Sequence, residues 1–323
     1  MPLAETRKIL TCCITREAYK LFVIRHHSCW DTTSLIINSP KWRMKTMLKL
    51  FKNLSIALLL VLISGNGQAA DYKSTWDQVM GTGVLRAGCI PGEPWGYKDP
   101  KTGEWSGFGP DIAKLLASEL KVKAECVETT WSGAVPGLQA NQFDIVAGLD
   151  ATPQRALAID FVYPMVYYGV AVLARRDHNF KSWDDLNNKD VIVSVPLGTS
   201  NDRAASARLP KATFFRPKTG AEAIAAWVSK RAHLVVGSST WLAFQNRALD
   251  NIGKVVIPSP ASFSSADVGM RKEKDKRWRD WVGVAIAYYY NRGHTQKVYD
   301  DFLRKRGMDP AEAPPILKEH YKF

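Results

Sequence analysis

The chain has 323 residues, 46% of them hydrophobic and 23% charged, a composition that suits a globular protein long enough for two domains and excludes a wholly disordered one. Its net charge of +13 is uneven, because residues 1–70 hold ten Lys and Arg against three acids and leave only +6 for the rest. The densest charged run, 271–279, alternates in sign, which is typical of a solvated face. We therefore expect no nucleic-acid partner.

Residues 44–70 have the layout of a secretory signal peptide. Lys45, Lys49 and Lys52 precede the apolar segment 54–63, and small residues follow up to an expected cleavage site near 69–71. The apolar segment is too short to span a bilayer comfortably, although a retained membrane anchor is the competing interpretation. No cysteine lies at the cleavage region, so we expect an exported protein that is not a lipoprotein.

Residues 1–43 lack sustained periodicity, and we interpret them as an upstream extension that is not part of the native protein. A signal peptide rarely follows so long a leader, so we expect no metal site here although the segment holds possible ligands. These are Cys12, Cys13, Cys29, His26 and His27. The exported part keeps Cys89 and Cys126, which suit either one disulfide or two buried thiols.

From residue 71 the expected strands and helices alternate, which predicts parallel sheets covered by helices on both faces. The loop after the first strand contains several Gly and Pro, so Glu93, Trp95 and Tyr97 project from a loop at a strand's carboxyl end. Trp131 opens a short helix before the third strand. In this half we expect strands at 84–88, 123–127 and 143–147, a helix at 110–120, and further apolar runs at 160–164 and 168–174.

The turn after the third strand is a candidate anion site. Thr152 is a good N-cap and Pro153 suits the first helical position, which places Arg155 at the third. An arginine there opposes the helix dipole, so helix stability does not explain it, whereas an anionic ligand does. A solvated or salt-bridged arginine is the competing interpretation.

The second half begins near residue 182 and repeats the alternation. Gly198, Thr199 and Ser200 follow a strand and open a helix, an arrangement that suits a carboxylate and equally suits an ordinary helix cap. Ser238 follows a later strand in the same way. We expect strands at 191–195 and 234–237, helices at 201–209 and 221–229, a crossing segment at 267–270, and two amphipathic helices at 278–289 and 295–305 whose aromatic residues are core.

The joint order of several motifs resembles the bacterial extracytoplasmic solute-binding proteins of amino-acid-type ABC transporters (polar amino acid, family 3). The resemblance covers roughly residues 82–305. The motifs are LRAG, GEPWGY, GFGPDIAKLLA, TTWSGAVPGLQANQFDIVAGLDATPQR, DFVYP, SWDDLNNKDVIVSVPLGTS and VGMRK. The resemblance implies an α/β, two-lobed periplasmic-binding-protein type II fold, each lobe a mixed, mostly parallel sheet flanked by helices. Lobe 1 would comprise 71–168 plus 269–323 and lobe 2 would comprise 169–268, with ligand in the cleft between them.

The resemblance also implies roles for particular residues. Arg155 occupies the position of the arginine that clamps the ligand carboxylate, in agreement with the dipole argument. Trp95 and Trp131 match positions that cover the ligand. The expected ligand-binding residues are Glu93, Trp95, Tyr97, Trp131, Gly148, Asp150, Thr152, Arg155, Gly198, Thr199, Ser200 and Ser238.

Departures from the family pattern leave the solute open. Ile90 and Ser238 stand where amino-acid binders commonly place acids, and Asp150 stands where a small hydroxyl residue or glycine is usual. A zwitterion could place its cation near Glu93 or Asp150, against an aromatic ring of Trp95, Tyr97 or Trp131. An unusual amino acid, a cyclic or methylated amino compound and a hydroxylated carboxylate all remain open. For Asp150, the competing interpretation is a structural acid that caps the Thr152 helix. For Glu93, it is an exposed loop acid.

The function we expect is a monomeric periplasmic receptor that closes on a small carboxylate-bearing solute and delivers it to the permease of an ABC importer. We expect no cofactor, no metal and no catalysis, since neither a Ser/His/Asp set nor a metal partner for His233 is evident. The alternative is a periplasmic dehydratase-like enzyme on the same fold, with Glu93 or Asp150 as general acid.

Overall fold

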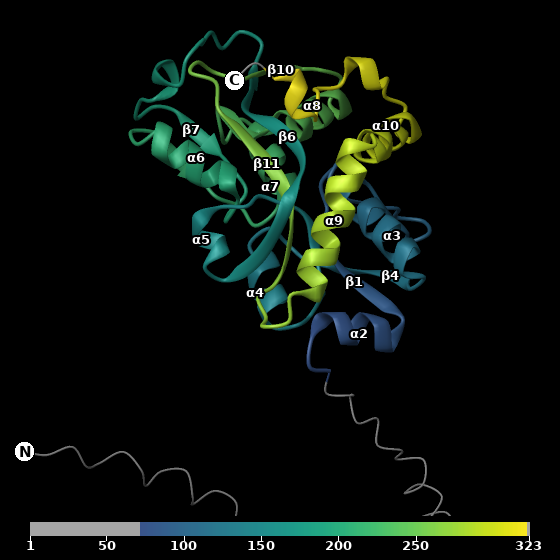
Figure 1. Cartoon of the computed structure of the whole chain (residues 1–323). Coiled ribbons are helices and arrows are strands. Elements are labelled where there is room, and N and C mark those ends of the chain that lie inside the picture. Colours follow the sequence, from purple (N-terminus) through teal and green to yellow (C-terminus); the bar gives the residue numbers. More distant parts are fainter. Residues whose placement is uncertain (1–71, 322–323) are drawn as a thin grey trace, which may run out of the picture. The chain divides into compact units, whose positions relative to one another are not determined.

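The computed structural model describes residues 72–321 (Figure 1). The expected upstream extension and signal peptide therefore lie outside the described residues. Among the described helices, none combines the length and the apolar character that a membrane crossing requires.

The first group of elements is built on two parallel strands. β1 (Val84–Cys89) pairs with β4 (Lys123–Glu128), and a single parallel bridge joins Ala87 to Ile145 just before β5 (Val146–Leu149). Helix α3 (Phe108–Leu120) packs Ile112, Leu116 and neighbouring small residues into the core. The remaining elements here are α2 (Thr75–Thr82), the hairpin β2 (Tyr97–Lys98) and β3 (Trp105–Ser106), α4 (Ala134–Gln139) and α5 (Pro153–Ala156).

Two long strands cross the molecule side by side (Figure 1). β6 (Ile159–Arg175) is one strand of 17 residues that unites the two apolar runs expected separately, and β11 (Phe263–Arg271) pairs with it antiparallel. β11 also pairs antiparallel with β5, and its register shifts on both sides of Asp267. Pro164 lies opposite Asp267 on β6 and has no N–H to donate to the ladder, which accounts for an irregularity at this point.

The second group of elements extends the sheet in the order β5-β11-β6-β9-β7-β8, with β10 also paired to β6. β7 (Ile192–Ser194) pairs in parallel with β8 (Thr213–Phe215) and with β9 (Leu234–Ser238). Antiparallel pairs in this sheet all involve β6 or β11, because these strands return across the molecule. The other elements are η1 (Asp184–Leu186), α6 (Ser200–Arg208), α7 (Gly220–Val228), α8 (Ser239–Ala248) and β10 (Gly253–Val256).

The chain ends with two helices that each place aromatic residues in the core, as expected. α9 (Arg277–Asn291) buries Trp278 and Ile286, and α10 (His294–Lys305) buries Tyr299 and Phe302. Short turns η2 (Pro310–Glu312) and η3 (Lys318–His320) follow. The predicted α/β architecture with mixed sheets and flanking helices is confirmed.

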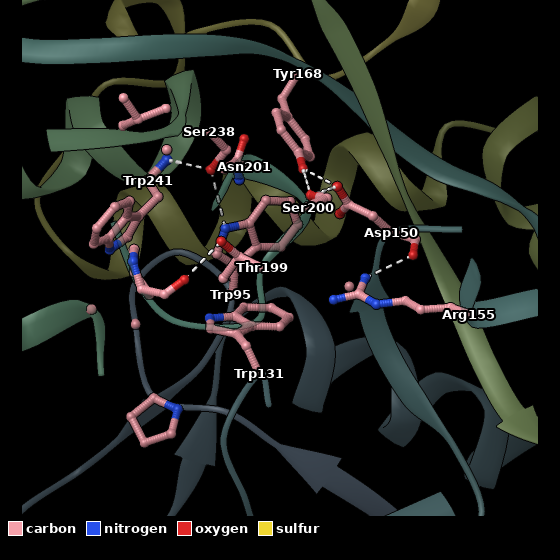
Figure 2. A pocket seen from close by; sticks show the side chains of 17 residues that line it. Trp95, Trp131, Asp150, Arg155, Tyr168, Thr199, Ser200, Asn201, Ser238 and Trp241 are labelled. Carbon is pink, nitrogen blue, oxygen red and sulfur yellow. Dashed lines mark hydrogen bonds between the residues drawn. The ribbon is translucent and has the colours of Figure 1, made fainter. Parts of the chain in front are cut away.

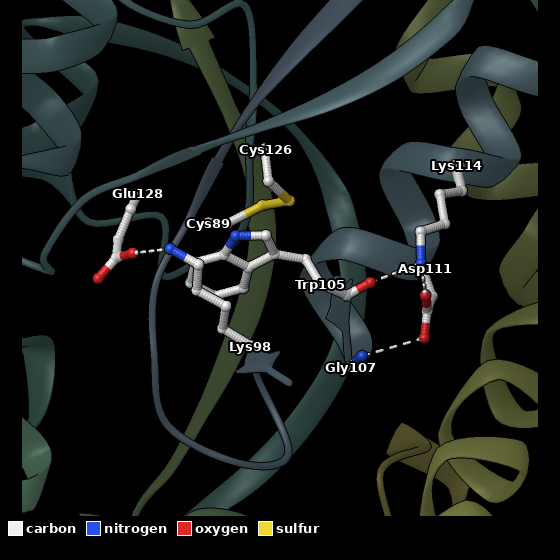
Figure 3. Close-up of a disulfide and its surroundings, with 8 residues drawn as sticks. All are labelled: Cys89, Lys98, Trp105, Gly107, Asp111, Lys114, Cys126 and Glu128. Atoms are coloured by element: carbon white, nitrogen blue, oxygen red, sulfur yellow. Dashed lines mark hydrogen bonds and ion pairs between the residues drawn. A yellow bond between two sulfur atoms is a disulfide. The ribbon is translucent and has the colours of Figure 1, made fainter. Parts of the chain in front are cut away.

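Cys89 and Cys126 form a disulfide between β1 and β4 (Figure 3), which decides between the two interpretations left open by the sequence. Their Cα atoms are 5.5 Å apart. Nearby, Lys98 forms an ion pair of 2.9 Å with Glu128 and lies over the ring of Trp105. Because Cys89 ends β1, the disulfide fixes the strand from which the Gly- and Pro-rich loop departs.

Candidate functional site

A cavity of about 50 Å³ lies where several strands end. The residues that follow β1, β5, β7 and β9 all contribute to its wall, as ligand sites in α/β folds do. Figure 2 shows the indoles of Trp95, Trp131 and Trp241 on one side, and Asp150 and Arg155 on the other. The lining residues are Pro91, Gly92, Trp95, Trp131, Gly148, Asp150, Arg155, Tyr168, Pro196, Thr199, Ser200, Asn201, Gly220, Val236, Gly237, Ser238 and Trp241.

Aromatic rings form the apolar wall of the cavity. Trp95 is 9% exposed and packs edge-on against Tyr168, with ring centroids 5.9 Å apart. Gly148 has φ +103°, and a Cβ there would lie 3.4 Å from the Trp95 ring and 3.9 Å from Trp131. Glycine therefore supplies both the backbone conformation and the space that these two indoles need.

Arg155 lies in the first turn of α5, as the Thr152 cap predicted. The side chain of Thr152 caps α5 by accepting a hydrogen bond from the backbone N–H of Arg155 at 3.3 Å. The guanidinium donates to the carbonyl oxygens of Asp150 at 2.8 Å and of Gly198 at 3.1 Å. Arg155 is only 7% exposed, and within residues 72–321 no salt bridge joins it to a carboxylate. Neither a solvated nor a salt-bridged arginine describes it.

Burial works against the charge of Arg155. Desolvation lowers the pKa of its guanidinium, and the negative charge of Asp150 opposes that effect. A buried cation without a salt-bridge partner is costly unless an anion completes its surroundings. The arrangement can therefore bind a carboxylate, which a guanidinium holds with two parallel hydrogen bonds.

Asp150 is the centre of a group of hydroxyls contributed by three elements. Its Oδ2 accepts hydrogen bonds from Tyr168 on β6, from Ser200 on α6 and, at 2.9 Å, from Ser264 on β11. Thr152 caps α5 instead, so Asp150 does not have the capping role that was its competing interpretation. Within the described residues, all the side-chain hydrogen bonds to this carboxyl end on Oδ2, and Oδ1 accepts none.

Burial raises the pKa of the Asp150 carboxyl, and the hydrogen bonds from Ser200, Tyr168 and Ser264 oppose that rise. Burial, together with the charge of Asp150, raises the pKa of the Tyr168 hydroxyl well above its usual value. Tyr168 therefore remains a neutral donor to Asp150. A cation next to Asp150 would favour the ionised carboxylate.

The start of α6 shows a division of roles. The Thr199 hydroxyl caps the helix by accepting from the N–H of Asp202 at 3.0 Å, as an ordinary cap does. Ser200 instead donates to Asp150, so its hydroxyl links α6 to the end of β5. Oδ1 of Asn201 is buried and has no hydrogen-bond partner in the described part of the chain. Ser238 caps α8, and its Oγ also accepts the indole N–H of Trp95 at 3.4 Å.

Four expected ligand-binding residues, Glu93, Tyr97, Thr152 and Gly198, do not line this cavity. Glu93 forms an ion pair of 2.5 Å with Arg306, whose guanidinium lies 4.1 Å from the ring centroid of Tyr97. Glu93 and Tyr97 line an adjoining cavity that shares Trp131 and Trp241 with the first. Thr152 acts as the cap of α5. Gly198 is not a lining residue but reaches the site through its carbonyl oxygen, which accepts from Arg155.

The structure adds residues that sequence reasoning missed. Tyr168 is the first residue of an apolar run, so no signal in the sequence marked it as a site residue. Asn201 directly follows Ser200, and Trp241 comes shortly after Ser238. Both lie after the end of a strand, so the prediction that such positions bind the ligand could have included them. The imidazole of His233 accepts the backbone N–H of Ile192 at 2.9 Å, a structural contact.

Comparison with known proteins agrees with the geometry. The family described as bacterial extracellular solute-binding proteins, family 3, matches residues 85–305. A cyclohexadienyl dehydratase of Pseudomonas aeruginosa is 26% identical, with 74% of this chain and 91% of that protein covered. An L-glutamate/L-aspartate-binding protein of the same species is 26% identical, with 77% and 86% covered.

The solved structures include an ancestral protein of similar fold. The ancestral amino acid-binding protein AncCDT-1, titled a precursor of cyclohexadienyl dehydratase, is 37% identical at a TM-score of 0.65. The alignment covers 71% of this chain and 99% of that one. A second structure of AncCDT-1 is titled an ancestral cationic amino acid solute-binding protein, again 37% identical, with a TM-score of 0.58 and the same coverage.

Proposed function

The chain belongs to the bacterial extracellular solute-binding proteins, family 3, and from this premise we propose that it is the periplasmic receptor of an amino-acid ABC importer. It closes on a small carboxylate-bearing solute and delivers that solute to the permease subunits. The observation that carries the proposal is Arg155, a buried guanidinium in the cavity wall whose hydrogen bonds within the described residues go to the carbonyl oxygens of Asp150 and Gly198. A solute carboxylate supplies the missing anion.

We further propose that the exported chain has two lobes, within 71–168 plus 269–323 and within 169–268, joined by β6 and β11. The cavity draws residues from both ranges. Contacts between them include the hydrogen bond from Arg155 to the carbonyl of Gly198 and the one from Ser200 to Asp150. Such contacts suit the closed state of a hinged cleft, whose opening would release them.

The solute class we propose is a cationic amino acid. Asp150 gives the cavity a carboxyl with one oxygen not used by the described hydrogen bonds, and Trp95, Trp131 and Trp241 offer ring faces to a cation. The 37% identical AncCDT-1 titled a cationic amino acid solute-binding protein supports the same class. In this arrangement the α-carboxylate contacts Arg155 and the positive charge lies near Asp150 and the indoles.

The test is a titration of the purified protein with L-arginine, L-glutamine and L-glutamate, followed by tryptophan fluorescence and calorimetry. We expect saturable binding that is tightest for L-arginine. Arg155→Ala should weaken it by about 30-fold or more, since truncating a buried charged contact costs about 2–5 kcal/mol. Arg175→Ala is the matched control, because Arg175 donates to carbonyls at the end of α7 and does not line the cavity. Equal affinities of Arg155→Ala and the control would contradict the proposal.

A second candidate function is a dehydratase activity. The observation that favours it is the buried Asp150 carboxyl with its raised pKa, the condition for a general acid, together with the 26% identity to a cyclohexadienyl dehydratase. Incubation with a cyclohexadienyl substrate, followed by chromatography of the products, tests it. Turnover that is lost in Asp150→Asn would support an enzyme, and saturable amino-acid binding without any product would support transport.

A further inference from the structure

Asp267 is a second buried carboxyl close to the cavity, and it lies outside the set of residues expected to bind solute. It occurs at the irregularity of β11, opposite Pro164, and is 2% exposed. Its Oδ2 accepts the backbone N–H of Ala151 at 2.9 Å and the hydroxyl of Ser265 at 2.9 Å. Ser264, which precedes Ser265 on β11, donates its hydroxyl to Asp150. β11 therefore supports both carboxyls.

One peptide group connects Asp267 to Arg155. The peptide between Asp150 and Ala151 donates its N–H to Asp267, and its carbonyl oxygen accepts Nη1 of Arg155 at 2.8 Å. An anion on the N–H side and a cation on the carbonyl side polarise the same peptide dipole in the same direction. Each hydrogen bond in such a chain strengthens the other.

We propose that Asp267 is a positioning residue: through this peptide it holds the turn that carries Asp150 and Arg155, and it makes solute affinity depend on pH. The inference rests on the proposed function for its second part, because only a solute clamped by Arg155 senses the orientation of the guanidinium. Its first part concerns the protein alone. Ionised Asp267 fixes the turn, and protonated Asp267 holds it with a weaker, uncharged hydrogen bond.

The surroundings of Asp267 place the titration of its carboxyl near pH 6. Burial raises its pKa to about 6, the hydrogen bonds from Ala151 and Ser265 oppose the rise, and the charge of Asp150 adds to it. On β6, Tyr167 has a raised pKa, chiefly because of its burial and then because of the charge of Asp267. α4 contributes no titratable side chain, and α5 contributes Arg155, whose guanidinium donates to the carbonyl oxygens of Asp150 and Gly198.

The experiment follows the Ala151 amide by nuclear magnetic resonance and the affinity for L-arginine by calorimetry, over the range from about pH 5 to about pH 7.5. In the natural protein we expect the amide proton shift to titrate with a midpoint near 6. Affinity should fall about fivefold towards acid pH with the same midpoint, since a charge-assisted hydrogen bond is about twice as strong as a neutral one.

Three variants separate positioning from a merely structural role. Asp267→Asn keeps an acceptor for Ala151 and does not titrate, so both midpoints should disappear. Ser265→Ala removes a hydrogen bond that favours the ionised carboxyl, so both midpoints should move to higher pH. Asp144→Asn is the control: it changes another buried carboxyl, paired with Arg86, and should lower the melting temperature without moving either midpoint.

An Ala151 amide that does not titrate, or a pH profile of affinity shared by the natural protein and Asp267→Asn, would overturn the inference. A titrating amide with no L-arginine binding at any pH would instead count against the proposed solute class. The positioning of the turn would then stand on the amide data alone.

Discussion

At the scale of single residues, the cavity combines two opposite charges that do not form a salt bridge. Arg155 donates to the backbone carbonyl of Asp150, while the Asp150 carboxylate accepts hydroxyls from Tyr168, Ser200 and Ser264. Because each side chain keeps binding capacity, a zwitterionic solute can contact both. The hydroxyls hold Asp150 in place without neutralising it.

Asp150→Asn tests the contribution of that charge to solute selection. We expect the affinity for L-arginine to fall about tenfold or more, while the affinity for L-glutamine changes less, because only the cationic side chain loses an opposite charge. Thermal melting should be unchanged or slightly raised, since burial already disfavours the ionised carboxyl. A lower melting temperature with unchanged solute preference would show that Asp150 is structural.

At the scale of elements, the disulfide and the strand ends determine where the first cavity loop begins. Cys89 is 1% exposed at the end of β1 and is joined to Cys126 on β4, a sequence separation of 37 residues. Pro91, Gly92 and Trp95 follow directly and reach the cavity. A constraint on β1 therefore also limits the freedom of this loop.

Removing the disulfide with Cys89→Ala and Cys126→Ala together should lower the free energy of unfolding by about 3 kcal/mol, mainly because the unfolded chain gains freedom. Urea unfolding measures this loss. The natural protein under reducing conditions provides the comparison and should show a similar loss. If both reduced and substituted proteins unfold at the urea concentration of the oxidised protein, the disulfide contributes nothing to stability.

At the scale of the whole molecule, local signals were readable from the sequence and long-range ones were not. The Thr152 cap and the placement of Arg155 depend on neighbouring residues, so the sequence predicted both. The pairing of Glu93 with Arg306 joins positions 213 apart, and nothing near Glu93 marks it. Asp267 acquires its position from the pairing of β11 with Pro164 and β5, which no periodicity of a single strand reveals.

Titration of Asp267 should change the stability of the whole molecule with pH in the direction opposite to its effect on solute affinity. Its folded pKa of about 6 exceeds the ordinary value of 3.8, so between these two values the folded state binds more protons than the unfolded state. Stability from this group is therefore complete below about 3.8 and is lost as pH rises through about 6, by roughly 3 kcal/mol in total.

The difference between the natural protein and Asp267→Asn isolates this contribution, because Asp150 and the other acids titrate in both. Urea unfolding at about pH 4.5 and about pH 7 should show the natural protein gaining stability relative to the variant at the lower pH. At acid pH the folded state would then be more stable, while the hydrogen bond from Ala151 to Asp267 that holds the turn would be weaker. A purely structural acid would not produce both effects. A stability difference that is the same at both pH values would mean that Asp267 keeps its ordinary pKa, and the acid-weakened affinity would need another source.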